Sequence, residues 1–248
     1  MKNVFRRPAS LKNVPFRYCP GCGHSIIHRL IAESIDNLGI RENVIGIAPV
    51  GCAIFAYDYF YFDMLDVAHG RPPAVATGLK RAMPDRIIFS YQGDGDLAAI
   101  GTGEIIHAAT RGENISVFFV NNATYGMTGG QMAPTTICNQ KTTTTPFGRK
   151  KEIDGYPLHI AELLSTIEGV SYIIRTSVDS VKNVIKTKKA IEKSFRYQIE
   201  KKGFSLVEIL SPCPVDWKLS PKDSLIWIRE KMMSVYPLGT FKDFYNKT

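Results

Sequence analysis

The chain has 248 residues, of which 44% are apolar and 22% are charged, an ordinary globular composition long enough for one large α/β domain. No apolar run approaches the roughly 20 residues that span a bilayer, and no apolar signal segment follows the basic N-terminus, so we expect a cytoplasmic protein without a membrane partner. The net charge is +8, but the basic residues are scattered and form no continuous stripe with interleaved aromatic residues. This distribution excludes nucleic acid as a partner. The excess of basic residues is explained either by attraction to an acidic partner protein or by solvated helix faces, such as the one predicted at residues 186–193.

A pair of cysteines, Cys19 and Cys22, precedes apolar residues at helical spacing over residues 27–38. In a cytosolic chain such a pair indicates metal binding or redox chemistry rather than a disulfide. Two further cysteines, Cys52 and Cys213, each stand in a Gly- or Pro-rich turn after a predicted core strand. The four thiolates can converge on one site, which suits either Zn²⁺ or an iron–sulfur cluster, and the sequence alone does not choose between them.

The stretch before the central motif contains a predicted strand at residues 44–48 and an aromatic run at residues 55–62, which is more typical of a core than of a ligand-binding wall. His69 stands directly before a predicted helix at residues 72–82, so we place it at a helix N-terminus, as either a ligand-binding or a structural histidine. The fifth cysteine, Cys138, is typical of a buried apolar position.

The centre of the chain predicts two adjacent parallel strands, residues 86–91 and 115–120, joined by a helix that ends at Thr110. A short Gly-containing loop follows each strand. Open parallel sheets bind ligands at the carboxyl ends of their strands, and the usual right-handed crossover sets these two loops side by side. We therefore expect both loops to form one site.

The polar groups of these loops indicate a Mg²⁺–diphosphate site. Asp94 and Asn122 offer side-chain oxygens and Thr124 a backbone carbonyl, which are the ligands that Mg²⁺ prefers. The glycines on either side of Asp94 let a phosphate approach the backbone, and the helix that opens near Asp96 directs its positive end to the same place. The Gly-x-Gly-x-x-Ala pattern that starts at Gly93 leaves a dinucleotide site open, and an ordinary strand–turn–helix is the alternative without a ligand.

The remaining chain begins with a long polar loop, residues 126–156, whose length is typical of a binding loop or lid. The pattern then predicts a helix near residues 158–164, a strand at 170–175, a long helix at 181–195 and a last strand at 204–210. The tail from residue 220 predicts a helix that packs on a neighbouring molecule. No linker or repeat is visible, so we expect one domain over residues 1–248.

These motifs together resemble a known family. Gly93-Asp94-Gly95, the 25 residues 96–120 and then Asn121-Asn122 are similar to the thiamine diphosphate motif, whose Asp and second Asn are Mg²⁺ ligands. The whole series resembles the β (thiamine diphosphate-binding) subunits of 2-oxoacid:ferredoxin oxidoreductases, most of all the 2-ketoisovalerate type. The motifs in chain order are Cys19-Pro20-Gly21-Cys22-Gly23-His24, Gly51-Cys52, His69-Gly70-Arg71, the acidic loop, Tyr125–Gln131 and Pro212-Cys213-Pro214.

The resemblance implies a thiamine diphosphate-binding α/β fold, a mostly parallel sheet with helices on both faces. It implies a [4Fe–4S] cluster on Cys19, Cys22, Cys52 and Cys213, and a Mg²⁺ ion on Asp94, Asn122 and Thr124. Residues 1–24 would be the N-terminal cluster-binding segment and residues 218–248 the packing tail. The implied cofactor pocket consists of Gly51, Cys52, His69, Gly93, Asp94, Gly95, Asp96, Asn122, Tyr125, Gly126, Met127 and Thr128.

The implied reaction is the oxidative decarboxylation of a 2-oxo acid to acyl-CoA and CO₂, with electrons leaving through the cluster to ferredoxin. In this family the glutamate that activates the cofactor belongs to a partner subunit, so we identify no catalytic residue in this chain and expect it to be inactive without that partner. The implied partners are the α subunit and the γ and δ subunits of the same complex. Pyruvate-cleaving relatives have Asn where Met127 stands, which favours a larger, branched substrate here. The alternatives are 2-oxoglutarate as substrate, a nonredox thiamine-dependent decarboxylase with structural Zn²⁺, and a nucleotide-binding module without chemistry.

Overall fold

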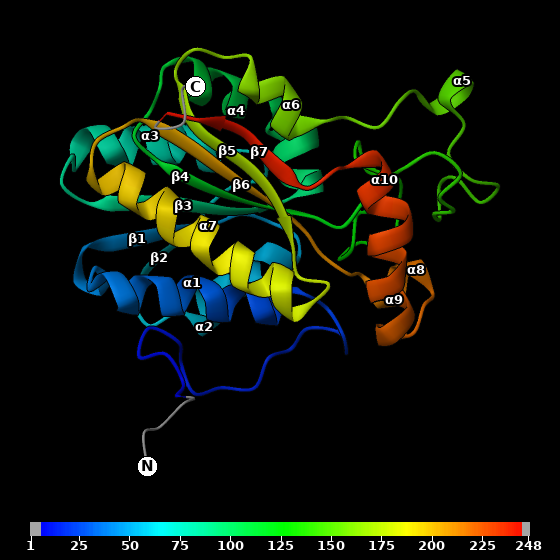
Figure 1. The fold of residues 1–248 in the computed structure, drawn as a ribbon, viewed down its shortest axis with the longest axis horizontal. Helices are drawn as coiled ribbons and strands as arrows, with labels where there is room; N and C mark the ends of the chain where they lie inside the picture. Colours follow the sequence, from blue (N-terminus) through cyan, green and yellow to red (C-terminus); the bar gives the residue numbers. More distant parts are fainter. Residues whose placement is uncertain (1–5, 245–248) are drawn as a thin grey trace.

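The computed structural model describes residues 6–244; residues 1–5 and 245–248, at the outer ends of the predicted N-terminal segment and tail, lie outside the described residues. One sheet runs through the protein in the order β2-β1-β3-β4-β6-β5-β7 (Figure 1). Its strands are β1 (Val44–Ala48), β2 (Asp63–Asp66), β3 (Ile87–Gly93), β4 (Ser116–Asn121), β5 (Val170–Ser177), β6 (Phe204–Leu210) and β7 (Gly239–Asp243). All neighbouring strands are parallel except β7, which is antiparallel to β5. The predicted α/β fold with a mostly parallel sheet is confirmed.

The central strands are buried along almost their whole length because helices cover both of their faces. On one face lie α1 (His24–Leu38) and α7 (Val181–Ile199), and on the other lie α3 (Pro72–Ala82), α4 (Thr102–Thr110) and α6 (Ile160–Ser165), as Figure 1 shows. Ile31 of α1 and Phe195 of α7 belong to the first core, and Ile105 of α4 and Leu164 of α6 belong to the second. The sheet core therefore holds the strand ends in fixed positions.

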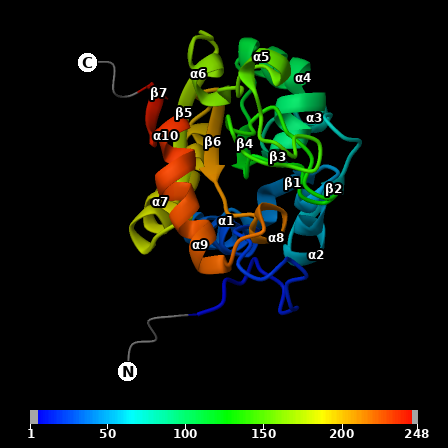
Figure 2. The same ribbon diagram turned by 90° about the vertical axis from the view of Figure 1, so that its right-hand side faces the viewer.

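The sequence predicted one helix for the tail, packed on a neighbour. The structure has a series of short elements there instead. It forms α8 (Pro214–Trp217), α9 (Pro221–Trp227), a π-helical turn η4 (Ile228–Met232) and α10 (Met233–Val235) before it enters the sheet as β7. Ile228, Met232 and Tyr236 are fully buried against Ala123 and Leu210 of the same chain. The apolar face of the tail thus covers the ends of this chain's own strands, which can be followed in Figure 2.

Short elements complete the chain: η1 (Arg41–Asn43), η2 (Cys52–Phe55), α2 (Ala56–Tyr59), η3 (Gly95–Ile100) and α5 (Lys151–Asp154). The sequence predicted one helix after the acidic loop, but the structure has two elements there. The π-helical η3 ends at Ile100, and α4 begins after Gly101. Within the aromatic run, Tyr59 and Phe60 are buried in the core, whereas Tyr57 and Tyr61 are exposed. Within residues 6–244, no helix has the length and apolarity needed to cross a membrane.

Candidate active site

A cavity of about 220 Å³ lies at the carboxyl ends of β1, β3 and β4. The loops after these three strands form most of its wall, as open parallel sheets require. All twelve residues that the resemblance assigns to the cofactor pocket line this cavity. Thr124 lines it as well, together with His24, Val50, Ala53, Ile100 and Val120, which the sequence did not single out. Residues more than 100 positions apart in the chain thus meet where the sequence predicted one site.

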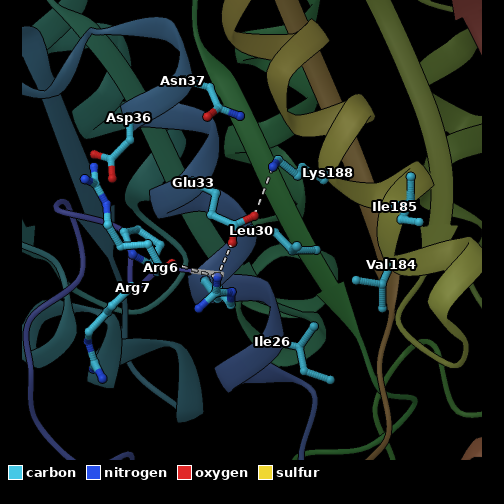
Figure 3. A pocket seen from close by; sticks show the side chains of 12 residues that line it. Arg6, Arg7, Ile26, Leu30, Glu33, Asp36, Asn37, Val184, Ile185 and Lys188 are labelled. Atoms are coloured by element: carbon cyan, nitrogen blue, oxygen red, sulfur yellow. Dashed lines mark hydrogen bonds and ion pairs between the residues drawn. The ribbon is translucent and has the colours of Figure 1, made fainter. Parts of the chain in front are cut away.

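A larger cavity, of about 560 Å³, lies elsewhere, between α1, α7 and the N-terminal segment (Figure 3). Its two carboxylates are already bound within the protein. Glu33 lies 2.5 Å from Arg29 and 3.0 Å from Lys188, and Asp36 accepts hydrogen bonds from the backbone of Ser10 and the residue before it. We therefore read it as a groove between packed elements and not as the reactive site.

Asp94 is buried at the end of β3 and is surrounded by donors from its own chain. Its Oδ1 accepts a hydrogen bond from the backbone of Gly95 at 2.8 Å. Its Oδ2 accepts one from the backbone N–H of Thr124 at 3.1 Å and one from the hydroxyl of Thr135 at 2.8 Å. Burial raises the pKa of Asp94 to about 7, although these hydrogen bonds oppose the rise. The loop after β4 is thereby fastened to the loop after β3.

The side-chain oxygen of Asn122 lies 3.0 Å from Oδ2 of Asp94 and 2.8 Å from the carbonyl oxygen of Thr124. All three atoms are acceptors, so no hydrogen bond joins them in this orientation. Turning the amide over would supply two hydrogen bonds, whereas a cation among the three oxygens would stabilise them as they stand. Adjacent ligands of an octahedral Mg²⁺ lie roughly 3 Å apart, because its bonds are roughly 2.1 Å long. The three predicted ligand atoms can therefore hold such an ion.

The two glycines beside Asp94 serve the site in different ways. A Cβ on Gly93 would meet no atom within 4 Å, so this residue leaves open space at the cavity wall. A Cβ on Gly95 would lie 2.7 Å from the ring of Tyr125. Gly95 is therefore required by the packing of Tyr125, a reason that the sequence did not reveal.

Asp96, which was predicted to bind the cofactor, lines the cavity, and its carboxylate accepts hydrogen bonds from other residues of the protein. It accepts hydrogen bonds from Nδ1 of His69 at 2.5 Å, the backbone of Gly70 at 2.6 Å and the amide of Gln92 at 2.6 Å. Because Nδ1 of His69 is held in this way, its Nε2 is the nitrogen left for a ligand. Burial raises the pKa of Asp96. Its contact with the cofactor stays a prediction, and the structure adds that its carboxylate orients His69.

The four predicted cluster cysteines come together beside this cavity. Burial is the main cause that raises the pKa of Cys22 to about 11 and of Cys52 to about 12, and the negative charge of the neighbouring thiolates adds to both shifts. Cys213 donates a hydrogen bond to Asp216 at 3.1 Å. Burial is the main cause that raises the pKa of Cys213, and Asp216 and then Cys22 add to the rise. Cys19, the exposed member, contributes to the raised pKa of both Cys22 and Cys52.

Among residues 6–244, no group of three His, Cys, Asp or Glu side chains is arranged to hold one metal ion. A cluster of four irons is larger than one ion, so this finding does not conflict with a four-cysteine cluster. Gly126 permits the close approach of the cavity loop to this region, since a Cβ there would lie 3.4 Å from the sulfur of Cys52.

Two buried histidines of α1, to which the sequence analysis gave no role, lie near this site, and one of them, His24, lines the cavity. Nδ1 of His24 lies 2.5 Å from the hydroxyl of Tyr91, and Nε2 of His28 lies 2.7 Å from the hydroxyl of Tyr18. That hydroxyl of Tyr18 also donates to the backbone carbonyl of Cys52 at 3.1 Å. Burial lowers the pKa of His24 to about 4 and that of His28 well below its usual value. Their spacing of four residues on a helix was the available signal.

Comparison with known proteins agrees with this geometry. Residues 51–209 match the model of the thiamine pyrophosphate enzyme, C-terminal TPP binding domain. The fold and this match define a thiamine pyrophosphate-binding domain. The chain is 46% identical to the ketoisovalerate oxidoreductase subunit VorA of Methanothermobacter thermautotrophicus over 98% of this chain and 53% of that one. It therefore spans about half the length of that relative.

Two further similar proteins make the family assignment of this chain more specific. The chain is 36% identical to the 2-oxoglutarate synthase subunit KorB of Methanocaldococcus jannaschii over 88% of this chain and 78% of that one. The solved 2-oxoglutarate:ferredoxin oxidoreductase from Magnetococcus marinus, with 2-oxoglutarate, coenzyme A and succinyl-CoA bound, superposes with a TM-score of 0.79 at 25% identity, over 97% of this chain and 85% of that one. The chain belongs to the β-type, thiamine diphosphate-binding subunits of the 2-oxoacid:ferredoxin oxidoreductases, as its motifs predicted.

Proposed function

We propose that the chain is the subunit that binds thiamine diphosphate, Mg²⁺ and a [4Fe–4S] cluster in a 2-oxoacid:ferredoxin oxidoreductase. The complex would convert a branched 2-oxo acid such as 2-ketoisovalerate to acyl-CoA and CO₂ and pass the electrons to ferredoxin. The observation that carries the proposal is the oxygen set of Asp94, Asn122 and Thr124, because the Asn122 oxygen lies 3.0 Å and 2.8 Å from the other two, as adjacent ligands of an octahedral cation do. The names of the relatives support the oxo-acid chemistry.

The residues of this chain would hold the reacting groups in place. Thiamine diphosphate supplies the electron sink for decarboxylation when it is bound. Asp94, Asn122 and Thr124 would hold the cation that accompanies its diphosphate, and His69, fixed through Nδ1 by Asp96, offers Nε2 as a hydrogen-bond partner. The four cysteines, Cys19, Cys22, Cys52 and Cys213, would hold the cluster on the other side of the cavity wall.

The cavity lacks one group that the family chemistry needs. Asp94 and Asp96 are the acidic residues among the described residues that line it, and both accept hydrogen bonds from the protein. We infer that the activating glutamate comes from the α subunit, as in the family, and that the γ and δ subunits complete the complex. This chain would then be inactive alone.

The lining also favours an apolar substrate tail. The residues that line the cavity include no Lys or Arg to pair with the second carboxylate of 2-oxoglutarate. Instead, Met127 stands at the rim with Val50 and Ile100, and all three side chains are exposed there. A branched aliphatic tail would bury these side chains. 2-Oxoglutarate remains the alternative, because it is named in the second relative.

The first experiment titrates thiamine diphosphate with Mg²⁺ into the anaerobically purified chain by calorimetry. Asp94→Asn should weaken binding by at least about 100-fold, because even the loss of a neighbour of a metal ligand typically costs about 10- to 100-fold. Asp58→Asn, the same change on the surface, is the control. Equal affinity of Asp94→Asn and wild type would contradict the proposed ion site.

The second experiment uses the anaerobically purified complex with its partner subunits. Coenzyme A-dependent reduction of a viologen dye is followed with 2-ketoisovalerate, 2-oxoglutarate and pyruvate. We expect the fastest reduction with 2-ketoisovalerate, and Met127→Asn should reduce that preference by about tenfold, the lower end for a change of one apolar contact. Unchanged preference in the variant would refute the substrate assignment. Zinc in place of iron and sulfide would favour the nonredox decarboxylase.

A further inference from the structure

One segment of the chain, residues 139–156, is not explained by the cofactor site. It carries α5, which stands apart from the sheet and its covering helices in Figure 1. We call residues 139–156 the arm. Three of its side chains are the large apolar ones of Phe147, Ile153 and Tyr156, with exposed fractions of 88%, 78% and 72%. Exposed apolar side chains gathered on one segment mark an interaction site.

The arm is internally ordered by Arg149, which is buried although it has no acidic partner. Its guanidinium donates hydrogen bonds to the backbone carbonyls of Thr136 at 2.6 Å, Pro134 at 2.9 Å, Gly155 at 2.9 Å and Tyr156 at 2.8 Å. The two sides of the arm also pair through reciprocal backbone hydrogen bonds between residues 139–140 and residue 149. These hydrogen bonds fix the backbone that carries the apolar side chains. The arm would therefore lose little conformational entropy when it binds a partner.

The base of the arm is joined to the loop that lines the cofactor cavity. The backbone of Thr143 donates to the carbonyl of Gly130 at 2.9 Å, and the hydroxyl of Thr144 accepts from the backbone of Met132 at 2.9 Å. The threonine tract at residues 142–145 therefore braces the end of the cavity loop. A partner molecule bound to the base of the arm would therefore lie beside the loop that lines the cavity.

We propose that the arm is a docking element for the partner subunit that closes the cofactor cavity. This inference rests on the proposed function, since it identifies the occupant with the subunit that supplies the missing carboxylate. Val50, Ile100 and Met127, which line the cavity, are likewise exposed and apolar, and that subunit would cover them together with the arm. Aromatic side chains such as Phe147 and Tyr156 are enriched at the centres of such interfaces.

A second copy of this chain fits the same surface less well. A symmetric pair would set this face against an identical one, and its cavity lining would again contain no glutamate. A different chain is needed to complete the site.

The test compares two variants with matched exposure. Ile153→Ser, combined with Phe147→Ser, removes the apolar end of the arm, whereas Val181→Ser removes an equally exposed side chain, also 78% exposed, from the start of α7. Affinity for the separately purified partner subunits of the native complex is measured by sedimentation velocity. The arm variant should bind at least about tenfold more weakly, the usual effect of losing central apolar contacts, and the control should match wild type.

A second measurement identifies the occupant. A photoreactive benzoylphenylalanine placed at Phe147 is irradiated in the assembled complex, and the cross-linked chain is identified by mass spectrometry. The α subunit is the expected product. A cross-link to a second copy of this chain, or unchanged affinity of the arm variant, overturns the inference.

The readouts also separate this inference from the proposed function. Calorimetry of thiamine diphosphate binding to each isolated variant reports the cofactor site, which the arm substitutions should leave unchanged. An assembled wild-type complex that reduces no dye with any 2-oxo acid defeats the proposed function. An active wild-type complex whose arm variants assemble normally defeats the docking inference alone.

Discussion

A buried ion-pair network behind the cofactor site predicts a large loss of stability when one member is removed. Arg175 of β5 is fully buried and lies 2.9 Å from the buried carboxylate of Glu208 on β6. Its other side pairs with Glu162 at 2.5 Å. Glu208 in turn accepts a hydrogen bond from Asn121 at 2.8 Å, and Asn121 accepts one from the backbone of Ala123 at 3.1 Å. The network therefore extends to the loop that carries the proposed ion ligands.

Arg175→Met keeps most of the buried side-chain length but leaves the charge of Glu208 without its partner. Removing one member of a buried pair typically costs about 3–5 kcal/mol. At about 2–4 °C per kcal/mol for a chain of this size, the melting temperature should fall by about 6–20 °C. The double variant Arg175→Met with Glu208→Gln removes both charges and should recover most of the loss.

The pH dependence gives the sign of the effect. Burial already raises the pKa of Glu208, and Arg175 opposes that rise. Without Arg175 the folded-state pKa rises further above the unfolded value of about 4.3, so the variant loses stability as pH increases through that range. Urea unfolding at several pH values measures this. A deficit that is the same at pH 4 and pH 8, or a double variant no more stable than Arg175→Met, would refute the reasoning.

Three further substitutions test the site. Cys213→Ser should remove most of the visible absorbance and labile sulfide of the anaerobically isolated chain, because a cluster ligand is lost, whereas Cys138→Ser should leave both unchanged. Gly95→Ala should weaken thiamine diphosphate binding in calorimetry, because its Cβ would displace the adjacent tyrosine ring. Asp96→Asn should weaken the same binding about tenfold, since it replaces the acceptor that orients His69.

Each of these predictions has a result that would contradict it. Full absorbance in Cys213→Ser would remove that residue from the cluster. Wild-type affinity in Gly95→Ala would show that the ring can move without harm. For Asp96→Asn, a fall in thermal stability with unchanged cofactor affinity would make the carboxylate a structural anchor and not a positioning group.

The strands that the sequence predicted best are those whose residues are all buried. Residues 44–48 are all apolar or small, residues 204–210 are so except for Glu208, and both strands have the predicted bounds. Strand β2 was missed because its sequence, Asp63 to Asp66, carries two acids and is ordered only by pairing with β1 at the edge of the sheet. Strand β7 was missed because its partner, β5, is more than 60 residues away in the chain.

The cavity wall was predictable from motifs, but the partners of its side chains were not. The spacing of Asp94 and Asn122 matches a known pattern, so their proximity was expected. Nothing near Asp96 in the sequence indicates that His69, 27 residues earlier, takes up its carboxylate. The same is true of Asn121, whose amide bonds to Glu208, 87 residues later. Long-range hydrogen bonds are set by the sheet order, which a single sequence does not reveal.

The position of β6 determines when the site can be assembled. Although β6 is the last parallel strand to be synthesised, it lies between β4 and β5, so the sheet stays divided into two unjoined parts until residue 210 has emerged. Cys213 follows three residues later. During synthesis from the N-terminus, the four cysteines can therefore meet only after all six parallel strands have been made. A group bound by all four would then stabilise an assembled parallel sheet and would not nucleate it, so maturation of the proposed cluster would be a late step, separable from folding of the sheet.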